Sequence, residues 1–488
     1  MAVPRSSADR PAISIGLFLV SLTALLIEVL LTRIFDVILT PHLAFMVITC
    51  AMFGLALGGL FDVALGTRGR PALDRPGQCF ALATWALSVL LNHIPFSLDR
   101  LGRQPFLQST YFLLLYLVLV APFFFAGLCL CRIFSSRPAE IQRLYGWDLI
   151  GAAVGAAVLI PLLPRLGPER LLLLGGIVGL VASVLLADRR SWLLSAGLAI
   201  AAIVVPRALG DRYLTLSLHD NKRNARRAIE AGRLEFLRWD AVSTIAVLDQ
   251  PRATSSPFDH GRKHIAYDGG TQSSDFFPFD GDFTTPRRDL TQRVAFQFWR
   301  RSVLASHYLR RDTGHTALII GGAGGQETKA TLLYGASHVD TVEMVGTMVE
   351  LATGPYSTYI GRLFQHPRVA PHVGEGRSFL RASRATYDVI QIFSNYTSSS
   401  LASGSGALAP DYLLTTDAYT EYFAHLKANG VLQINHVAYP RMIATAATAW
   451  SALGRDNFRS HVLVHDGLAL CEPYHQSNTC GRVRPTHR

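Results

Sequence analysis

The pattern of apolar residues divides the chain near Pro206. Up to that point apolar runs follow one another with short polar interruptions, and beyond it Asp, Arg, His and Gly recur as in an ordinary soluble protein. A bilayer core about 30 Å thick requires roughly 17 to 25 apolar residues per helix, and a helix satisfies its own backbone amides inside lipid. The pattern therefore predicts a polytopic α-helical membrane domain over residues 1–206.

Seven segments of this part are candidate spans: 12–34, 43–65, 78–95, 108–131, 147–163, 169–187 and 191–206. The third and the last three are short for a crossing. The first run is too long for a signal peptide and another follows almost at once, so we expect it to stay as an anchor. Glycine-rich stretches at 54–59 and 151–155 predict closely packed helices.

Of the ionisable residues in or beside these runs, three are singled out. Glu28 and Arg33 belong to the first run and Asp148 begins the fifth. Charges at membrane depth are costly and are usually paired or line a polar path. Asp148 and Arg33 also suit an interfacial position at a helix end, so Glu28 is the better functional candidate.

The distribution of basic residues gives two conflicting signals for orientation. With the amino terminus inside, most loop arginines fall on the cytoplasmic side, which the charge bias of membrane loops favours. With seven spans, the soluble part would lie outside the cytoplasm. The basic segment after the last span, 207–227, instead favours a cytoplasmic position for it. An even number of spans reconciles the two. We predict a multi-pass inner-membrane protein whose soluble part lies in the cytoplasm.

Composition excludes one class of partner. The chain has a net charge of +11, but its arginines are scattered, and the soluble half has no basic stripe with interleaved aromatic residues. Nucleic-acid binding is therefore not expected. Cys471 and Cys480 have His475 between them, so they suit either a disulfide or part of a metal site. Two or three ligands make a weak zinc signal, and we therefore favour free thiols.

The soluble part begins with strand-like sequence. Residues 233–249 are rich in β-branched and aromatic residues, and a further strand ends in the turn 267–270. We expect a linker and a small β-layer over 207–287. An amphipathic stretch, 288–311, then leads into the last domain, 288–488.

The most informative segment is a strand, glycine turn, helix and strand. The apolar strand 316–320 runs into Gly321–Gly325, followed by the helical stretch 326–334 and the strand 339–343. Glycines let the backbone approach a ligand, and the helix amino terminus presents free N–H groups to it. Glu343 stands at about the spacing expected for a carboxylate that binds both ribose hydroxyls. The segment therefore predicts a nucleoside-binding βαβ unit.

Further alternation of strands and helices predicts a parallel sheet. Strands are expected at 369–373, 387–392 and 431–436, with a helix at 417–427. Ligands bind beyond the carboxyl ends of such strands, where the glycine turn, Glu343, Glu375 and the segment 393–396 meet. Residues 461–464 and 468–471 suggest a closing antiparallel hairpin.

Three segments carry a family resemblance: LIIGGAGGQETKATLLYGASHVDTVEMV, HPRVAPHVGEGRSFLRASRATYDVIQI and TTDAYTEYFAHLKANGVL. They resemble the spermidine synthase-like, or polyamine aminopropyltransferase-like, branch of class I S-adenosylmethionine-dependent transferases, specifically bacterial members with a membrane-spanning amino-terminal half. IEVLLTR and YGWDLIGAAVGAA in the first half are similar too. The resemblance covers most of 230–440. It implies a Rossmann-like methyltransferase fold that uses S-adenosylmethionine or its decarboxylated form as co-substrate, without a metal.

The resemblance also implies roles for individual residues. Gly321, Gly322, Gly324 and Gly325 would line the methionine part of the ligand, Glu343 would bind its ribose, and Glu375 with Gly376 would lie at the adenine edge. Gln272 falls where similar proteins place a ligand-contacting Gln, and we add Glu327 to the binding set. Glu375 is equally suited to capping a helix, and Gln272 to a solvated loop.

The catalytic positions depart from the family pattern. Similar aminopropyltransferases carry two aspartates after the fourth strand, and here Phe393 and Tyr396 occupy those positions. An ammonium nucleophile must lose a proton before it attacks, so a general base is needed. The acidic diamine-binding motif is also degraded, to 274–277. The remaining candidates are Ser394, Asn395, Tyr396 and Asp411, with Asp275, Glu327 and Tyr412 beside them.

We therefore expect a membrane-bound transferase that passes an aminopropyl or methyl group to a polyamine or a lipid. The alternative is a non-catalytic sensor or transporter whose soluble domain binds a nucleoside ligand. The sequence leaves open whether the chain is catalytic, and whether it forms a homo-oligomer.

Overall fold

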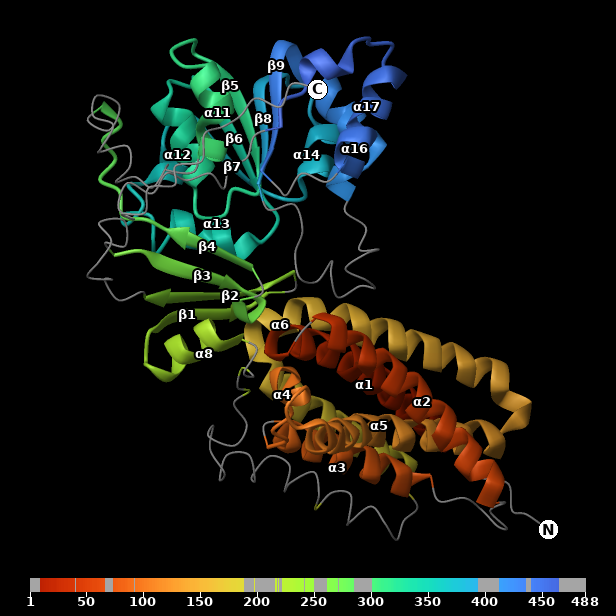
Figure 1. Ribbon diagram of the computed structural model, residues 1–488. Coiled ribbons are helices and arrows are strands. Elements are labelled where there is room, and N and C mark those ends of the chain that lie inside the picture. The colour runs from red at the N-terminus through yellow and green to blue at the C-terminus, as the bar shows by residue number, and fades with distance from the viewer. Residues whose placement is uncertain are drawn as a thin grey trace, which may run out of the picture.

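The computed structural model describes residues 9–39, 41–65, 73–91, 93–187, 222–240, 242–249, 261–270, 272–284, 301–393, 412–435 and 440–464, with the single residues 197, 216 and 218. Figure 1 shows a helical bundle, a small antiparallel sheet beside one end of it, and a parallel α/β unit beyond that sheet.

The bundle consists of α1 (Asp9–Ile38), α2 (Pro41–Leu65), α3 (Asp74–Leu90), α4 (Leu98–Leu101), α5 (Pro105–Ser136) and α6 (Ile141–Leu186). Among the described residues four helices, α1, α2, α5 and α6, are long and apolar enough to cross a membrane. The predicted count of seven separate spans stays a prediction, because part of the segment 1–206 lies outside the described residues. The third candidate is α3, of only 17 residues, the fifth and sixth both belong to α6, and the seventh, 191–206, lies outside the described residues.

Helix α6 changes direction at Gly167, whose φ of 75° and ψ of 166° are not helical. In its first half Gly151 and Gly155 lie against the backbone of α1 at Phe18 and Leu22, and a Cβ at Gly155 would come within 2.2 Å of the Leu22 carbonyl. In its second half Gly175 contacts Ile27, and Leu186 lies against Gly16. The two halves therefore run along α1 in opposite directions. The predicted close packing at 151–155 is confirmed.

The small sheet is an antiparallel meander of β1 (Leu234–Trp239), β2 (Thr244–Asp249), β3 (Lys263–Tyr267) and β4 (Gln272–Phe276). The strand-like region 233–249 is thus two strands. Both faces of the sheet are covered. Ala246 and Leu248 pack against α8 (Arg223–Glu230), while Ile245 and Val247 join the core of the α/β unit.

The parallel sheet has the order β7-β6-β5-β8-β9. Apolar side chains on its two faces form two separate cores, one with α12 and α13 and the other with α14, α16 and α17, while α11 lies against α12, β8 and β9 (Figure 1). The strands are β5 (Thr316–Ile320), β6 (His338–Glu343), β7 (Val369–Val373), β8 (Tyr387–Phe393) and β9 (Leu426–Asn435). The helices are α11 (Arg301–Leu309), α12 (Gln326–Leu333), α13 (Gly346–Thr353), α14 (Gly376–Ala382), α16 (Thr416–Ala424) and α17 (Pro440–Ala452).

Two expected elements differ near the carboxyl end. The helix predicted to reach residue 427 ends at Ala424, because β9 begins at Leu426 and bulges before it pairs again at Val431. Lys427 in the bulge donates to Asp388 at 2.8 Å. The predicted closing hairpin was wrong in its first arm: residues 458–461 form a 3-10 helix and 462–464 are not a strand. Its second arm lies outside the described residues.

One buried carboxylate joins the bundle to the small sheet. Asp268, in the turn after β3, is fully buried and accepts from Arg33 of α1 at 3.2 Å and from the Thr244 backbone N–H at 2.8 Å. Arg33 also donates to Asp36 at 2.9 Å, and the Lys222 ammonium donates to the Asp268 carbonyl at 2.8 Å. Arg33 therefore contacts the small sheet from the last part of α1, and its interfacial position stays a prediction.

Asp148 and Glu28, the other two ionisable residues that the sequence singled out, differ from each other. Asp148 accepts a hydrogen bond from the Ser21 hydroxyl of α1. Glu28 is partly exposed and has no hydrogen bond or ion pair with the residues that the structure describes. Its functional role stays a prediction.

The contact between the bundle and the small sheet can be tested at Gly269, where a Cβ would lie 2.4 Å from the Val37 carbonyl of α1. Gly232 is the matched control, since its φ of 71° equals the 68° of Gly269 within a few degrees but nothing lies within 4 Å of its Cβ position. Both alanine variants carry the cost of the left-handed backbone, roughly 1–2 kcal/mol. We expect Gly269→Ala to lower the melting temperature by a further 2 °C or more, at roughly 2–4 °C per kcal/mol. Equal melting temperatures would contradict the contact.

Candidate functional site

The predicted glycine turn connects β5 to α12. Gly321 and Gly325 have φ values of 86° and 82°, which favour glycine. The Gly321 N–H donates to the Val342 carbonyl of β6, and the Gly325 N–H to the Gly322 carbonyl. A Cβ at Gly324 would lie 2.1 Å from the Asp275 carbonyl. The turn is therefore pressed against the end of β4, and the small sheet forms one wall of the site.

Glu343 ends β6 and is tied to the glycine turn. Its Oε2 accepts from the Ala323 N–H at 2.8 Å, and its Oε1 accepts from the Val345 N–H at 3.0 Å. Burial raises the pKa of this carboxyl, and the backbone hydrogen bonds oppose the shift. Each carboxylate oxygen has a second acceptor direction, so two ribose hydroxyls could still donate to it.

The carboxyl ends of the neighbouring strands leave apolar side chains exposed. Met344, directly after β6, is 37% exposed, and Val373, which ends β7, is 61% exposed. Nothing lies within 4 Å of a Cβ position at Gly374. Exposed apolar surface beside a hydrogen-bonding carboxylate suits one face of a planar base.

Glu375 and Gly376 begin α14. The Glu375 carboxylate accepts from the backbone N–H groups of Arg377 at 2.9 Å and Ser378 at 2.7 Å, and from the Ser378 hydroxyl. It therefore caps the helix, the alternative considered from the sequence. A Cβ at Gly376 would lie 2.4 Å from the Ile320 side chain, so the helix start packs directly against β5. Their predicted contact with adenine stays a prediction.

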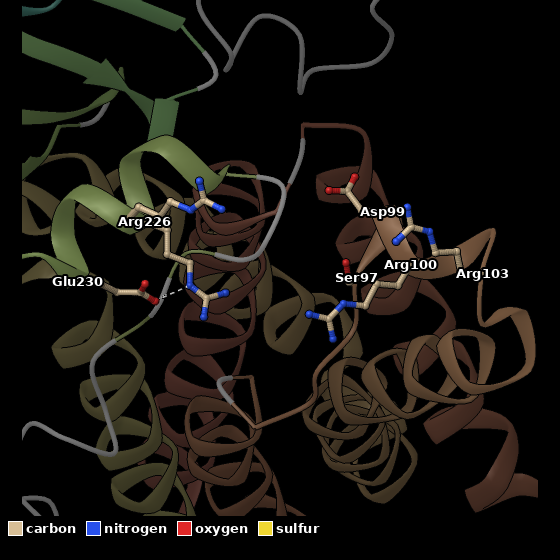
Figure 2. A pocket seen from close by; sticks show the side chains of 7 residues that line it. Ser97, Asp99, Arg100, Arg103, Arg226 and Glu230 are labelled. Atoms are coloured by element: carbon tan, nitrogen blue, oxygen red, sulfur yellow. Dashed lines mark hydrogen bonds and ion pairs between the residues drawn. The ribbon is translucent and has the colours of Figure 1, made fainter. Parts of the chain in front are cut away.

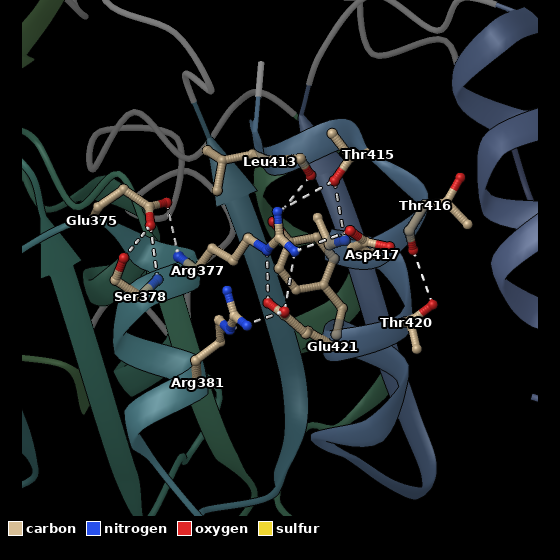
Figure 3. Close-up of polar contacts among 12 residues, drawn as sticks. Glu375, Arg377, Ser378, Arg381, Leu413, Thr415, Thr416, Asp417, Thr420 and Glu421 are labelled. Atoms are coloured by element: carbon tan, nitrogen blue, oxygen red, sulfur yellow. Dashed lines mark hydrogen bonds and ion pairs between the residues drawn. The ribbon is translucent and has the colours of Figure 1, made fainter. Parts of the chain in front are cut away.

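An ion-pair network fixes this helix to α16 (Figure 3). The Arg377 guanidinium makes two contacts with the Glu421 carboxylate, at 2.8 and 3.1 Å, and these raise the pKa of Arg377 further. Arg381 approaches the same carboxylate at 3.4 Å. Thr415 caps α16 by accepting from the Ala418 N–H and lies 3.5 Å from Arg377. The network thereby holds the segment 412–415, which leads into α16, beside Glu375.

Two buried ionisable residues near the glycine turn were not predicted from the sequence. The Tyr267 ring is buried, and burial together with the charges of Glu343 and Asp268 raises the pKa of its hydroxyl well above 10. Lys329, one turn into α12, is almost completely buried. Its ammonium has no hydrogen-bond partner among the described residues and lies 5.0 Å from the Phe279 ring centroid. Burial lowers the pKa of Lys329 to about 7. The polar sequence of this helix does not indicate that Lys329 is buried, because its surroundings include Phe279, which is distant in the sequence.

The remaining candidates are only partly placed. Ser394, Asn395, Tyr396 and Asp411 lie outside the described residues. Gln272 begins β4 opposite Tyr267, and Glu327 is buried in the first turn of α12. Asp275 is paired with His264 at 3.0 Å. Within the described ranges no group of three or more His, Cys, Asp or Glu side chains could hold a metal ion.

Comparison with known proteins gives a weak result. No family model matches the chain, and no curated protein is significantly similar to it. Among solved structures it is similar to a spermidine synthase in complex with the transition-state analogue AdoDATO and to the spermidine synthase from Thermotoga maritima. Each is 18% identical with a TM-score of 0.30, and the match covers 46% of this chain and 63% of the other. The chain thus spans less than two thirds of either structure, and this similarity carries no functional conclusion.

Proposed function

We propose that the chain is a membrane-bound transferase that binds S-adenosylmethionine or decarboxylated S-adenosylmethionine beside Glu343. The observation that carries the proposal is the buried Glu343 carboxylate, held by the Ala323 N–H of the glycine turn at the carboxyl edge of a parallel sheet. Such edges are where α/β folds bind nucleotides. The exposed Met344 and Val373 offer apolar contact to an adenine base.

The co-substrate would supply an activated carbon next to a sulfonium. The acceptor's nucleophilic atom attacks that carbon, the C–S bond breaks, and a neutral thioether leaves, while the acceptor's proton passes to a base. We propose Lys329 as a candidate base. Its pKa is lowered to about 7, so its amine is partly neutral near physiological pH, and its backbone N–H donates to Gly325 of the glycine turn.

The acceptor is a polyamine or a lipid. The four long apolar helices favour a lipid, since they would hold the α/β unit at a bilayer surface. On the small sheet, whose β4 lies against the glycine turn, the described carboxylate Asp275 is already paired with His264 at 3.0 Å.

A ligand-sensing role is the second candidate function. It is favoured by the position of Tyr267 directly before Asp268 in the chain. Tyr267 is close enough to Glu343 for that charge to raise its pKa, and Asp268 binds Arg33 of the bundle. Such a sensor would bind the same ligand without turnover.

Ligand binding can be tested by calorimetry on the purified protein. We expect S-adenosylmethionine, its decarboxylated form or methylthioadenosine to bind, and Glu343→Ala to weaken binding roughly 10- to 100-fold through lost charge-assisted hydrogen bonds. Glu350→Gln, at an exposed carboxylate on the next helix, is the control and should bind normally. No heat with any of the three ligands would exclude the proposal. Binding without radiolabel transfer to polyamines or lipids would favour the sensor.

The buried amine predicts a pH-dependent stability. The folded pKa of Lys329, about 7, lies below its unfolded value, so folding releases a proton between about pH 7 and pH 10 and stability rises with pH in that window. We expect Lys329→Met to raise the melting temperature at pH 7, with a gain that shrinks toward pH 10. Lys329→Arg should lower it throughout. A gain from Lys329→Met that is equal at both pH values would show that the amine does not titrate there.

The bundle also predicts the relative orientation of the two ends of the chain. The end of α1 at Arg33 contacts the small sheet, whereas its start near Gly16 lies at the opposite end of the bundle (Figure 1). If α1 crosses a membrane, the amino terminus and the α/β unit lie on opposite sides. A cytoplasmic α/β unit, as we propose, then requires an external amino terminus, which the arginine distribution of the loops opposes. Reporter fusions at both ends should report opposite compartments, and the same compartment at both ends would contradict this arrangement.

A further inference from the structure

A charged cavity lies between the bundle and α8, away from the glycine turn. Its volume is about 420 Å³, within the roughly 300–1,000 Å³ of small-molecule sites. Figure 2 shows that its lining comes from two segments that face each other, around α4 and on α8. The lining residues are Ser97, Asp99, Arg100, Arg103, Arg226, Arg227 and Glu230.

The cavity carries an excess of positive charge. It is lined by two arginines from each side and only two carboxylates, and one of these, Glu230, is 2.7 Å from the Arg226 Nε. Neither Arg103 nor Arg227 has a side-chain hydrogen bond or ion pair with the described residues. Like charges that converge on one space repel, and an anion between them would remove that repulsion.

The surroundings of the cavity indicate which kind of anion it would take. α5 begins at Pro105, directly after this loop, so the arginines stand at the end of a helix long and apolar enough to span a membrane. Beside them Phe106 is 90% exposed, and Leu98 and Leu101 are each 39% exposed. Basic groups next to a span, flanked by exposed apolar side chains, match the boundary where lipid phosphates meet acyl chains.

We propose that this cavity binds a phosphate group, supplied by the headgroup of an anionic membrane lipid. The lipid phosphate lies between Arg103 of the bundle and Arg227 of α8, and its acyl chains extend along Leu98, Leu101 and Phe106. The lipid thereby holds α8, and with it the small sheet, against the bundle. The proposal rests on α5 spanning a membrane, but it is independent of the proposed transferase activity.

The test measures melting temperature and binding for the full chain in neutral detergent. The probes are short-chain phosphatidylglycerol, short-chain phosphatidylcholine and inorganic phosphate. We expect phosphatidylglycerol to raise the melting temperature, and the double variant Arg103→Gln/Arg227→Gln to bind it on the order of 30-fold more weakly. Arg384→Gln/Arg459→Gln removes the same charge from exposed positions of the α/β unit and should bind like the unmodified protein.

The outcomes separate the sources of the phosphate. Stabilisation by phosphatidylglycerol alone supports the lipid, whereas equal stabilisation by inorganic phosphate supports the phosphate site but overturns the lipid as its source. Arg103→Lys/Arg227→Lys should restore much of the binding, which shows that a loss in the Gln variant is not misfolding. Undiminished binding by a folded Gln variant, or no binding of any probe to the unmodified protein, overturns the proposal.

Discussion

The buried Asp268 carboxylate is the constraint on which the arrangement of this protein depends. A buried charge is tolerated only when its partners are in place, and removing one of them costs several kcal/mol. The Asp268 carboxylate accepts from Arg33 in α1 and from the Thr244 backbone N–H at the start of β2. The backbone carbonyl of Asp268 accepts from Lys222, before α8, so three separate parts of the chain meet at this residue. No one of these parts can shift alone. The bundle and the small sheet are therefore fixed relative to each other at this point.

The same turn bears on the candidate site, because Tyr267 precedes Asp268 directly. β3 pairs with β4, and β4 ends against Gly324 of the glycine turn. A displacement of the Asp268 turn would therefore move the wall of the nucleoside site as well. Spatial continuity of this kind becomes coupling only if the junction has two arrangements of similar free energy. The bundle and the site at least share a structural element through which such coupling can act.

Local patterns predicted the features that depend on neighbouring residues. The strand, glycine turn and helix at 316–334, the position of Glu343 and the parallel sheet follow from short-range spacing, and the structure has them. Features that depend on distant residues were missed. The burial of Lys329 requires Phe279, and the extra residues of β9 are anchored by the contact of Lys427 with Asp388. The break in α6 at Gly167 falls between the predicted spans 147–163 and 169–187, so the apolar pattern indicated it, whereas the contact of both halves with α1 depends on residues far away in the sequence.

The proposed dual use of Glu343 would explain why a buried acid is retained in this site. Without a ligand its carboxylate already holds the Ala323 and Val345 N–H groups, so the turn keeps its shape. The free-energy cost of removing this carboxylate from water is part of folding. A ligand that donates hydrogen bonds to its remaining acceptor directions therefore binds without that cost. A site prepared in this way favours ligands with two adjacent hydroxyl donors over those with one. If the proposed function holds, the glycine turn and Glu343 would select a ribose-like diol before any catalytic residue is considered.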